Sequence, residues 1–202
     1  MFFSFDGIDG AGKTTQIERF AKWLTGRGHD VTVYRDPGST ELSERLREIL
    51  LDKSGIPISS EAEMMLYMTA RTQLLRESVM PDLANGKTVI VDRYVLATLA
   101  YQGHAGDVSL DAIRSVGDFA TGGNYPVLTF VLDLDPNVSH TRRDREPDRM
   151  EARGLEYLAK VRQGFLVEAA SNDSICVIDA SQSIDDVEQA IRSAAEAVLP
   201  SN

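Results

Sequence analysis

The fold of this chain is decided by one stretch near its start, Gly7-Ile8-Asp9-Gly10-Ala11-Gly12-Lys13-Thr14-Thr15. It satisfies the pattern G-x-x-x-x-G-K-[S/T], with the apolar run Phe2–Phe5 before it and the amphipathic run Thr14–Thr25 after it. In this context, glycines let successive backbone N–H groups turn inward around phosphate at a helix N-terminus. The stretch therefore predicts a nucleoside triphosphate site, with the Lys13 ammonium against the β- and γ-phosphates and the Thr14 hydroxyl on Mg²⁺. A dinucleotide-binding loop is excluded, because the third glycine of G-x-G-x-x-G is absent.

Outward from this loop, short apolar runs alternate with longer runs of helical period. The apolar runs predict strands at Phe2–Phe5, Val31–Tyr34, Thr88–Val91, Val127–Leu132 and Ser174–Ile178. Apolar residues three and four apart predict helices at Thr14–Thr25, Leu42–Leu51, Ala62–Leu83, Leu110–Thr121, Leu155–Ala170 and Ile184–Val198. Strands that are apolar throughout suit a parallel sheet covered on both faces. We expect an α/β protein with a five-stranded parallel sheet in a three-layer α/β/α arrangement, in one domain over residues 1–202.

The composition bounds the class of protein. With 43% hydrophobic and 26% charged residues among 202, the chain is typical of a globular protein. A net charge of −10 opposes broad nucleic-acid binding, so an anionic substrate would need a local basic cluster. The single cysteine, Cys176, excludes an internal disulfide and a multi-cysteine zinc site. Neither a signal peptide nor a membrane span is recognisable, and we expect a cytoplasmic protein with no membrane or nucleic-acid partner.

Two further features bear on phosphate chemistry. Asp92 follows directly on the apolar run Thr88–Val91, where a P-loop enzyme keeps the acid that helps hold Mg²⁺ and its waters. The polar segment His140–Arg153 carries five arginines, whereas the loop between Gly7 and Gly12 has none. Transfer of a phosphoryl group needs cations around the moving charge, so this segment is the expected source of a catalytic arginine. A GTPase is excluded, since no Asn/Thr-Lys-x-Asp guanine motif is present.

Beyond the phosphate loop, short motifs follow one another in a fixed order. They are Arg35-Asp36-Pro37-Gly38-Ser39-Thr40, Leu66-Tyr67-Met68-Thr69-Ala70-Arg71, Asp92-Arg93-Tyr94, Ala100-Tyr101-Gln102-Gly103, Asp148-Arg149-Met150-Glu151 and Asp179-Ala180-Ser181-Gln182. With the loop, this ordered set resembles the bacterial type of the thymidylate kinase (dTMP kinase) family over nearly the whole chain. The resemblance implies a P-loop kinase with a short lid at about 140–153, transferring the γ-phosphoryl group of MgATP to dTMP for dTTP synthesis. It also implies a homodimer, for which Ala62–Leu83 and Leu110–Thr121 are candidate contacts.

The resemblance implies a dTMP site that begins with three charged residues. Asp9 matches the family carboxylate that faces the monophosphate and accepts a bond from the sugar 3′-hydroxyl. Arg35 and Arg93 match the arginines near the acceptor phosphate. Both arginines follow strand ends, where α/β proteins bind ligands, and their planar forks suit a bidentate grip on phosphate. These two arginines favour an acceptor that already carries a phosphate.

The base and sugar contacts come from two later motifs. Tyr67 and Arg71 lie four apart on one helix face and match the aromatic that stacks on thymine and the arginine that donates to its O4. Thr98 and Tyr101 match positions beside the deoxyribose, where Tyr101 would crowd a 2′-hydroxyl. Gln102 adds a polar contact to the substrate.

The expected roles on the ATP side rest on the phosphate-loop pattern and on the resemblance, except that Arg143 and Arg145 are chosen from the arginine cluster of His140–Arg153. ATP is expected to contact Gly7, Asp9, Gly10, Ala11, Gly12, Lys13, Thr14, Thr15, Arg143, Ala180, Ser181 and Gln182. The expected catalytic residues are Lys13, Asp92, Arg93, Arg143 and Arg145. Thr14 and, through water, Asp92 are the expected contacts of Mg²⁺, the one cofactor besides the co-substrate ATP.

The sequence departs from the family pattern at Tyr67, where phenylalanine is usual, and at three further positions. Asp36 stands for the usual glutamate, Ser39 for a glycine, and Ala97 for a common serine that would add a hydroxyl to the acceptor site. Two alternatives stay open from the residues alone. One is a P-loop kinase for another nucleoside monophosphate or a deoxynucleoside. The other is a nucleotide-binding switch without turnover, which would need no second nucleotide site.

Overall fold

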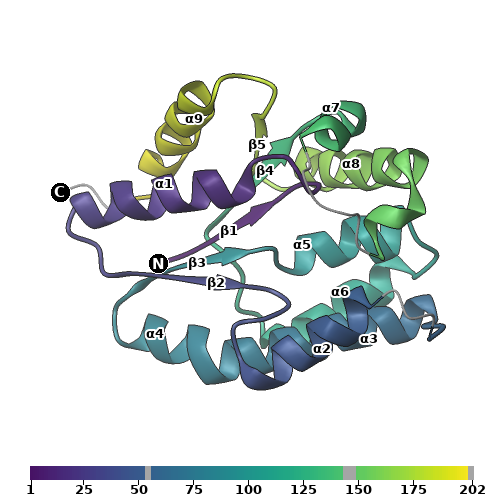
Figure 1. Cartoon of the computed structure of the whole chain (residues 1–202). Helices are drawn as coiled ribbons and strands as arrows, with labels where there is room; N and C mark the ends of the chain where they lie inside the picture. Colours follow the sequence, from purple (N-terminus) through teal and green to yellow (C-terminus); the bar gives the residue numbers. More distant parts are fainter. Residues whose placement is uncertain (53–55, 143–148, 200–202) are drawn as a thin grey trace.

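A parallel five-stranded sheet forms the centre of the molecule (Figure 1). The computed structural model describes residues 1–52, 56–142 and 149–199. The strands are β1 (Phe2–Asp6), β2 (Val31–Arg35), β3 (Thr88–Asp92), β4 (Leu128–Asp133) and β5 (Ile175–Asp179), in the order β2-β3-β1-β4-β5. This confirms the predicted α/β fold class. Each strand runs one residue further than predicted and ends on a charged residue, because ladder pairs such as Arg35 with Asp92 and Asp133 with Asp179 keep that residue in the sheet.

Helices cover both faces of the sheet (Figure 1). One layer holds α1 (Lys13–Gly26), α8 (Leu155–Ala170) and α9 (Ile184–Glu196). Their buried residues, such as Phe20, Phe165 and Ile191, pack on Phe3, Phe5 and Phe130 of the sheet in one apolar core. Burial of this aromatic cluster removes large apolar surfaces from water and fixes the helix that follows the phosphate loop.

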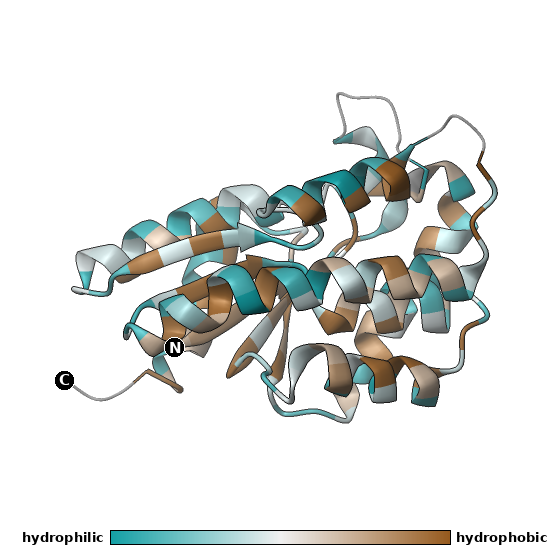
Figure 2. Cartoon of the chain, turned by 90° about the horizontal axis from the view of Figure 1, so that it is seen from below, coloured by the Kyte–Doolittle hydropathy of each residue, from teal (hydrophilic) through white to brown (hydrophobic). Residues whose placement is uncertain are grey.

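The other layer holds α2 (Glu41–Leu51), α3 (Ser60–Leu74), α4 (Met80–Ala84) and α6 (Leu110–Thr121). Met68 and Ile113 from this layer join Val89 and Val91 of the sheet in a second core. Seen from below, where this layer faces the viewer, apolar and polar residues alternate along the helices (Figure 2), as expected of amphipathic helices.

The predicted helix Ala62–Leu83 is interrupted in the structure. Between α3 and α4 lies a π-helical turn, η1 (Leu75–Val79), in which the Met80 N–H donates to the Leu75 carbonyl. The break comes just before Pro81, which has no N–H to donate to the preceding turn.

Three short helical elements lie outside the predicted set. They are α5 (Val95–Thr98) continued by the π-helical η2 (Leu99–His104), α7 (Pro136–Thr141) and the 3₁₀ turn η3 (Glu151–Arg153). α5 and α7 begin shortly after the ends of β3 and β4 and, with 4 and 6 residues, are too short to show a helical period. These elements carry residues that line the site. The candidate functional residues therefore converge at the carboxyl-terminal edge of β1, β3 and β4.

Candidate active site

The phosphate loop connects β1 to α1 and depends on two glycines. Gly7 has φ 132°, and a Cβ there would lie 2.6 Å from the Leu132 carbonyl oxygen, so no larger residue fits between the loop and β4. Gly12 is the N-cap of α1 in the left-handed conformation, with φ 93°. Glycine adopts such angles without steric cost. The predicted strand–loop–helix arrangement is therefore present.

Lys13 occupies the centre of this loop. Its side chain is buried, and its Nζ donates to the carbonyl oxygens of Gly7 (3.1 Å) and Ile8 (3.0 Å). Burial lowers the pKa of Lys13, with Arg93 acting in the same direction. The ammonium thus bonds to backbone oxygens that a nucleotide phosphate can replace with a stronger, charged acceptor.

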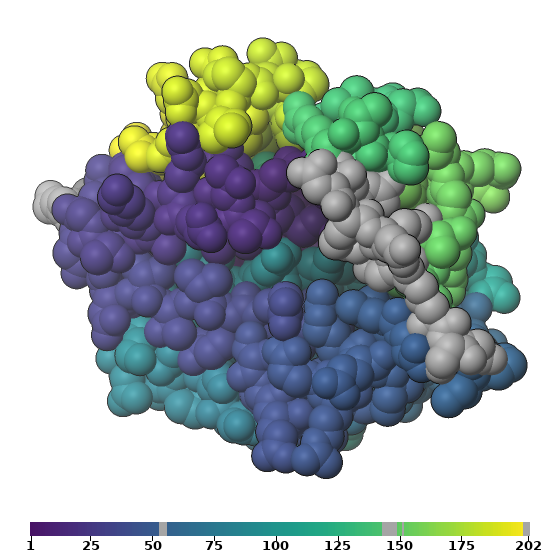
Figure 3. Space-filling view, viewed as in Figure 1, coloured from purple at the N-terminus to yellow at the C-terminus, as the bar shows by residue number. Residues whose placement is uncertain are grey.

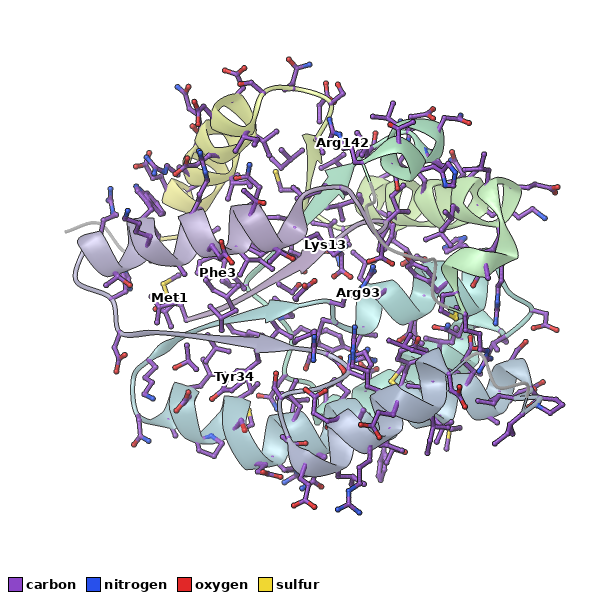
Figure 4. All side chains as sticks on the ribbon, in the orientation of Figure 1. Met1, Phe3, Lys13, Tyr34, Arg93 and Arg142 are labelled. Carbon is purple, nitrogen blue, oxygen red and sulfur yellow. The ribbon has the colours of Figure 1, made fainter. Side chains whose placement is uncertain are left out.

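Arg93 links the loop to β3. Its Nη2 donates to Asp9 Oδ1 (2.7 Å) and its Nη1 to the Gly7 carbonyl (3.0 Å), while Lys13 Nζ lies 3.7 Å from Asp9 Oδ1. Arg93 adopts φ 71°, an unfavourable angle for a residue with a side chain. Figure 4 shows Lys13 and Arg93 near one another at the carboxyl ends of the central strands. The loop carboxylate Asp9 is thereby matched by two cations, as its place among phosphate-binding groups requires.

The predicted dTMP residues converge on one cavity. Of the eight residues expected there, seven line it: Asp9, Tyr67, Arg71, Arg93, Thr98, Tyr101 and Gln102. Its other lining residues are Asp36, Pro37, Arg47, Leu51, Ala97 and Met150. The cavity is thus built from residues far apart in the sequence, which α3, α5, η2 and the phosphate loop bring together.

Arg71 is the most heavily bonded residue of this cavity. Its side chain is 1% exposed, and its Nε donates to Asp36 Oδ2 at 2.5 Å. Its Nη1 donates to Thr98 Oγ1 (3.2 Å) and its Nη2 to the Tyr94 carbonyl (3.0 Å). Burial raises the pKa of Asp36, although Arg71 beside it acts in the opposite direction. The guanidinium is therefore held in place before any substrate enters.

Tyr101 lies against the Arg93 guanidinium. The Arg93 Cζ is 5.1 Å from the centroid of the Tyr101 ring, a cation–π contact. The ring also packs edge-on against Phe165, with the centroids 6.2 Å apart. This packing fixes the ring plane in the wall of the cavity, so its position does not depend on a bound ligand.

A second cavity adjoins the first and contains the phosphate loop. It is lined by Asp9, Gly10, Gly12, Lys13, Thr14, Thr15, Arg35, Asp36, Arg47, Asp92, Arg93 and Arg142. Asp9, Asp36, Arg47 and Arg93 line both cavities. In the space-filling view, the surface is hollowed between the N-terminal part of the chain and α2, and residues from the middle of the chain lie at the bottom of this hollow (Figure 3). The two cavities thus form neighbouring chambers with a shared wall of charged residues.

Arg35 and Arg47 form the basic rim of this second cavity. Arg35, expected in the dTMP site, lines only the phosphate-loop cavity, and its Nη2 donates to both carboxylate oxygens of Glu44 at 3.1 Å. Arg47, absent from the predicted set, lines both cavities and donates to the Pro37 carbonyl at 3.1 Å. The sequence could have indicated this position, because Arg47 lies four residues after Ser43 and three before Leu50. Both are buried, so Arg47 faces the inner side of α2.

The carboxylates beside the loop fit the donor set of a hard divalent cation. Asp92 and Thr14 line the same cavity. Asp92 Oδ1 and both oxygens of Asp6 are buried and accept no hydrogen bond within residues 1–52, 56–142 and 149–199. Burial raises the pKa of Asp6 to about 6. Oxygen ligands next to a phosphate site are those that Mg²⁺ prefers. No group of three or more potential His, Cys, Asp or Glu ligands occurs among the described residues.

A third cavity also borders the phosphate loop. Ala180 and Gln182 line it with Gly10, Ala11, Gly12, Thr15, Gln16, Arg142, Ile184 and Val187. Ser181 is not among its lining residues: its N–H (2.9 Å) and Oγ (2.6 Å) donate to Asp179 Oδ1 and shape the turn. These bonds and that from Gln182 lower the pKa of Asp179 to about 2. The loop after β5 is thus held by its own carboxylate beside the phosphate loop.

Of the predicted lid residues, those expected to be catalytic, Arg143 and Arg145, lie outside the described residues. Arg142 immediately before them is described and lines both the phosphate-loop cavity and the third cavity. Its Nη1 donates to the Ala180 carbonyl at 3.2 Å. Figure 4 shows Arg142 on the same side of the sheet as Lys13. An arginine therefore lies beside the phosphate loop at the end of α7.

Comparisons with known proteins agree with this arrangement. The model of the thymidylate kinase family matches residues 5–191. A thymidylate kinase of Bifidobacterium longum subsp. infantis is 40% identical over 206 residues, covering 100% of this chain and 88% of its own length. That of Thermosipho africanus is 37% identical over 202 residues and covers 100% of both chains. The crystal structure of thymidylate kinase from Ehrlichia chaffeensis superposes with a TM-score of 0.78 at 28% identity, over 96% of this chain and 98% of that one. The chain belongs to the thymidylate kinase family.

Proposed function

We infer that this chain transfers the γ-phosphoryl group of ATP to dTMP, giving dTDP and ADP. It is a kinase whose acceptor is a phosphate group, and family membership supports this reaction. The observation that carries it is the pair of adjoining cavities with Asp9 and Arg93 in their shared wall. A donor phosphate on the loop and an acceptor phosphate in the neighbouring cavity would meet at these two residues. A switch that binds a single nucleotide has no use for the second cavity.

The proposed mechanism is mainly positioning and charge neutralisation, as phosphoryl transfer requires. Lys13 exchanges the Gly7 and Ile8 carbonyls for phosphate oxygens of ATP. Arg93 holds the acceptor phosphate in line, with Asp9 fixing the guanidinium and accepting from the sugar 3′-hydroxyl. Arg143 and Arg145 are proposed to supply positive charge to the moving group. Bound nucleotides exclude water from the two chambers and so limit wasteful hydrolysis of ATP.

The remaining residues are proposed to bind and orient the two nucleotides. Tyr67 and Arg71 contact thymine, Thr98 and Tyr101 lie beside the deoxyribose, Gln102 contacts the base, and Arg35 and Arg47 face the phosphates. The amides of Gly10–Thr15 hold the ATP phosphates, and Ala180 and Gln182 flank the adenine. Thr14 and Asp92 would hold Mg²⁺, which neutralises charge on the β- and γ-phosphates when bound.

Measurement of ADP release over a panel of nucleoside monophosphates and deoxynucleosides tests this function. We expect turnover with dTMP to exceed that with dCMP, dAMP and dGMP, and no turnover with thymidine. Preference for another monophosphate would assign a different kinase. Tight ATP binding without turnover on any acceptor would instead favour a nucleotide-binding switch.

We further propose that the chain acts as one domain, as a homodimer in the cytoplasm. The resemblance implies the dimer, and the candidate contact helices carry exposed apolar side chains: Phe119 of α6 is 87% exposed and Met65 of the neighbouring α3 is 50% exposed. Within the described residues, no helix has the length and hydropathy needed to cross a membrane. Light scattering of the wild type and of Phe119→Asp tests the dimer. We expect a dimer for the wild type and a monomer for the variant; two equal masses would contradict this interface.

A further inference from the structure

Glu63 is a buried carboxylate at the edge of the dTMP cavity for which the reaction assigns no task. It lies on α3, four residues before Tyr67 and eight before Arg71, and so on the same helix face. Its side chain is 1% exposed. A buried carboxylate is costly unless it is compensated, so its partners indicate what it does.

Three side chains from other elements converge on this carboxylate. Arg153 Nη2 donates to Oε2 at 2.9 Å and to Oε1 at 3.2 Å, and Arg149 Nη2 also donates to Oε2. Gln102 Nε2, from η2, donates to Oε1 at 2.8 Å. Two guanidinium groups thus compensate the charge, and the remaining bond is to a residue that lines the dTMP cavity.

The bond to Glu63 determines which way the Gln102 amide faces. A carboxylate only accepts hydrogen bonds, so the amide NH₂ must face Glu63. Gln102 is 2% exposed, and its Oε1 forms no hydrogen bond with any described residue. The polar atom that Gln102 has left for a ligand is therefore an acceptor.

An acceptor from Gln102 and the donors of Arg71 together suit one kind of base edge. Thymine presents an N3–H donor beside the O4 acceptor, whereas cytosine presents an N3 acceptor beside an N4 donor. A reversed amide would offer its NH₂ to thymine N3–H, donor against donor. Discrimination between the two bases therefore depends on the orientation of this amide.

We propose that Glu63 is a positioning residue for base selectivity. By accepting from Gln102 Nε2, it presents Gln102 Oε1 to the N3–H of a thymine or uracil base, while Arg149 and Arg153 compensate its buried charge. The inference deepens the proposed function, on which it rests, and concerns the pyrimidine edge only. Glu63 itself does not touch the substrate.

Glu63→Gln tests the proposal, because the new amide can donate to Gln102 and so permits the reversed orientation. We expect the dissociation constant of dTMP to rise about tenfold, the scale of one lost hydrogen bond, and that of dUMP to rise equally. The dissociation constant of dCMP should fall or stay unchanged, so the dTMP/dCMP ratio shifts at least about tenfold. Isothermal titration calorimetry gives these constants, and ATP affinity should stay at the wild-type value. Glu61→Gln, an exposed position on the same helix, is the matched control.

Gln102→Met keeps the proposal falsifiable if Glu63→Gln does not fold. It removes the amide without leaving a buried charge unpaired and should shift the dTMP/dCMP ratio by a similar factor. In the Gln102→Met background, Glu63→Gln should produce no further shift in that ratio. An unchanged ratio in Gln102→Met, or in a folded Glu63→Gln protein, would overturn the role of Glu63. Wild-type protein that does not phosphorylate dTMP would instead refute the proposed function.

Discussion

The two halves of the site differ in how their cations are held. In the cavity proposed to bind dTMP, Arg71 is buried and donates to the Asp36 carboxylate, the Thr98 hydroxyl and a backbone carbonyl. On the donor side, Lys13 bonds to loop carbonyls and Arg142 to the Ala180 carbonyl. Carbonyl oxygens are weaker acceptors for a cation than carboxylates or phosphates. The acceptor half is thus organised in advance, whereas the donor half keeps cations that phosphate can recruit.

This difference matches the demands of the reaction. Recognition of a base needs donors and acceptors fixed in direction, because selectivity comes from unpaired polar groups in the wrong complex. Phosphoryl transfer needs cations that interact more strongly with the transition state than with the resting protein. Substitutions in the two halves should therefore alter different kinetic constants.

The largest effect on catalysis is expected for Lys13→Ala. Removing the ammonium takes away a charge that stabilises the phosphates, and turnover should fall by ~10³-fold or more. The thermal unfolding temperature should change little, because the contacts of Lys13 Nζ are with the loop itself: two loop carbonyls and, at 3.7 Å, the Asp9 carboxylate. Steady-state kinetics and a melting curve test both statements. The exposed Lys22→Ala on the same helix is the control, and near-normal turnover in folded Lys13→Ala protein would refute the P-loop role.

Next come the arginines of the lid. Arg143→Ala or Arg145→Ala should lower kcat and kcat/KM together by at least ~10²-fold, since an arginine supplied to the transition state contributes about 10³–10⁵ in rate. The affinity for dTMP should not change. Single-turnover transfer at saturating ATP and dTMP removes product release from the comparison, with Arg142→Ala as the neighbouring variant. Wild-type rates in both single variants and the double variant would move the catalytic charge to Arg93, Arg142 or Arg149.

In the acceptor half, Arg71→Ala separates binding from stability. Loss of a charge-assisted hydrogen bond should weaken dTMP binding by about 1.5–3 kcal/mol. Loss of its partner would also leave Asp36 buried and unpaired, which costs about 3–5 kcal/mol of folding stability. Arg71→Ala with Asp36→Asn should recover much of that stability but none of the dTMP affinity. Calorimetric binding and urea unfolding measure the two quantities, and recovery of both in the double variant would make Arg71 purely structural.

The smallest effect is expected at Tyr101. Its hydroxyl is buried and forms no hydrogen bond within the described residues, so Tyr101→Phe should keep stability and the preference for dTMP over its 2′-hydroxyl analogue. Tyr101→Ala opens space and should reduce that preference by about tenfold, ~1.4 kcal/mol. The ratio of kcat/KM for the two nucleotides is the measurement. An undiminished ratio in the alanine variant would exclude a steric role for the ring.

The phosphate loop shows how far local sequence reaches. Gly7 and Gly12 adopt the backbone angles that only glycine takes easily, and the strand before them and the helix after them follow from periodicity over adjacent residues. The five strands could be predicted within one residue for the same reason. The π-helical turns at Leu75–Val79 and Leu99–His104 could not be predicted, because one such turn alters the spacing of apolar residues too little to be detected in the sequence.

The sequence by itself determined the fold class and the phosphate loop, and through resemblance it supplied candidate residues for the nucleotide sites. Only the tertiary structure decided which charges belong together: Arg71 with Asp36, Arg93 with Asp9, and Glu63 with Gln102. It also placed Arg47 in the wall between the two cavities and Arg35 at the rim of the phosphate-loop cavity. The physical reason is the range of the interactions. Backbone preferences and hydrophobic periodicity act over a few neighbouring residues, whereas these pairs join residues 35 to 84 positions apart and form only when the sheet and its helices have packed.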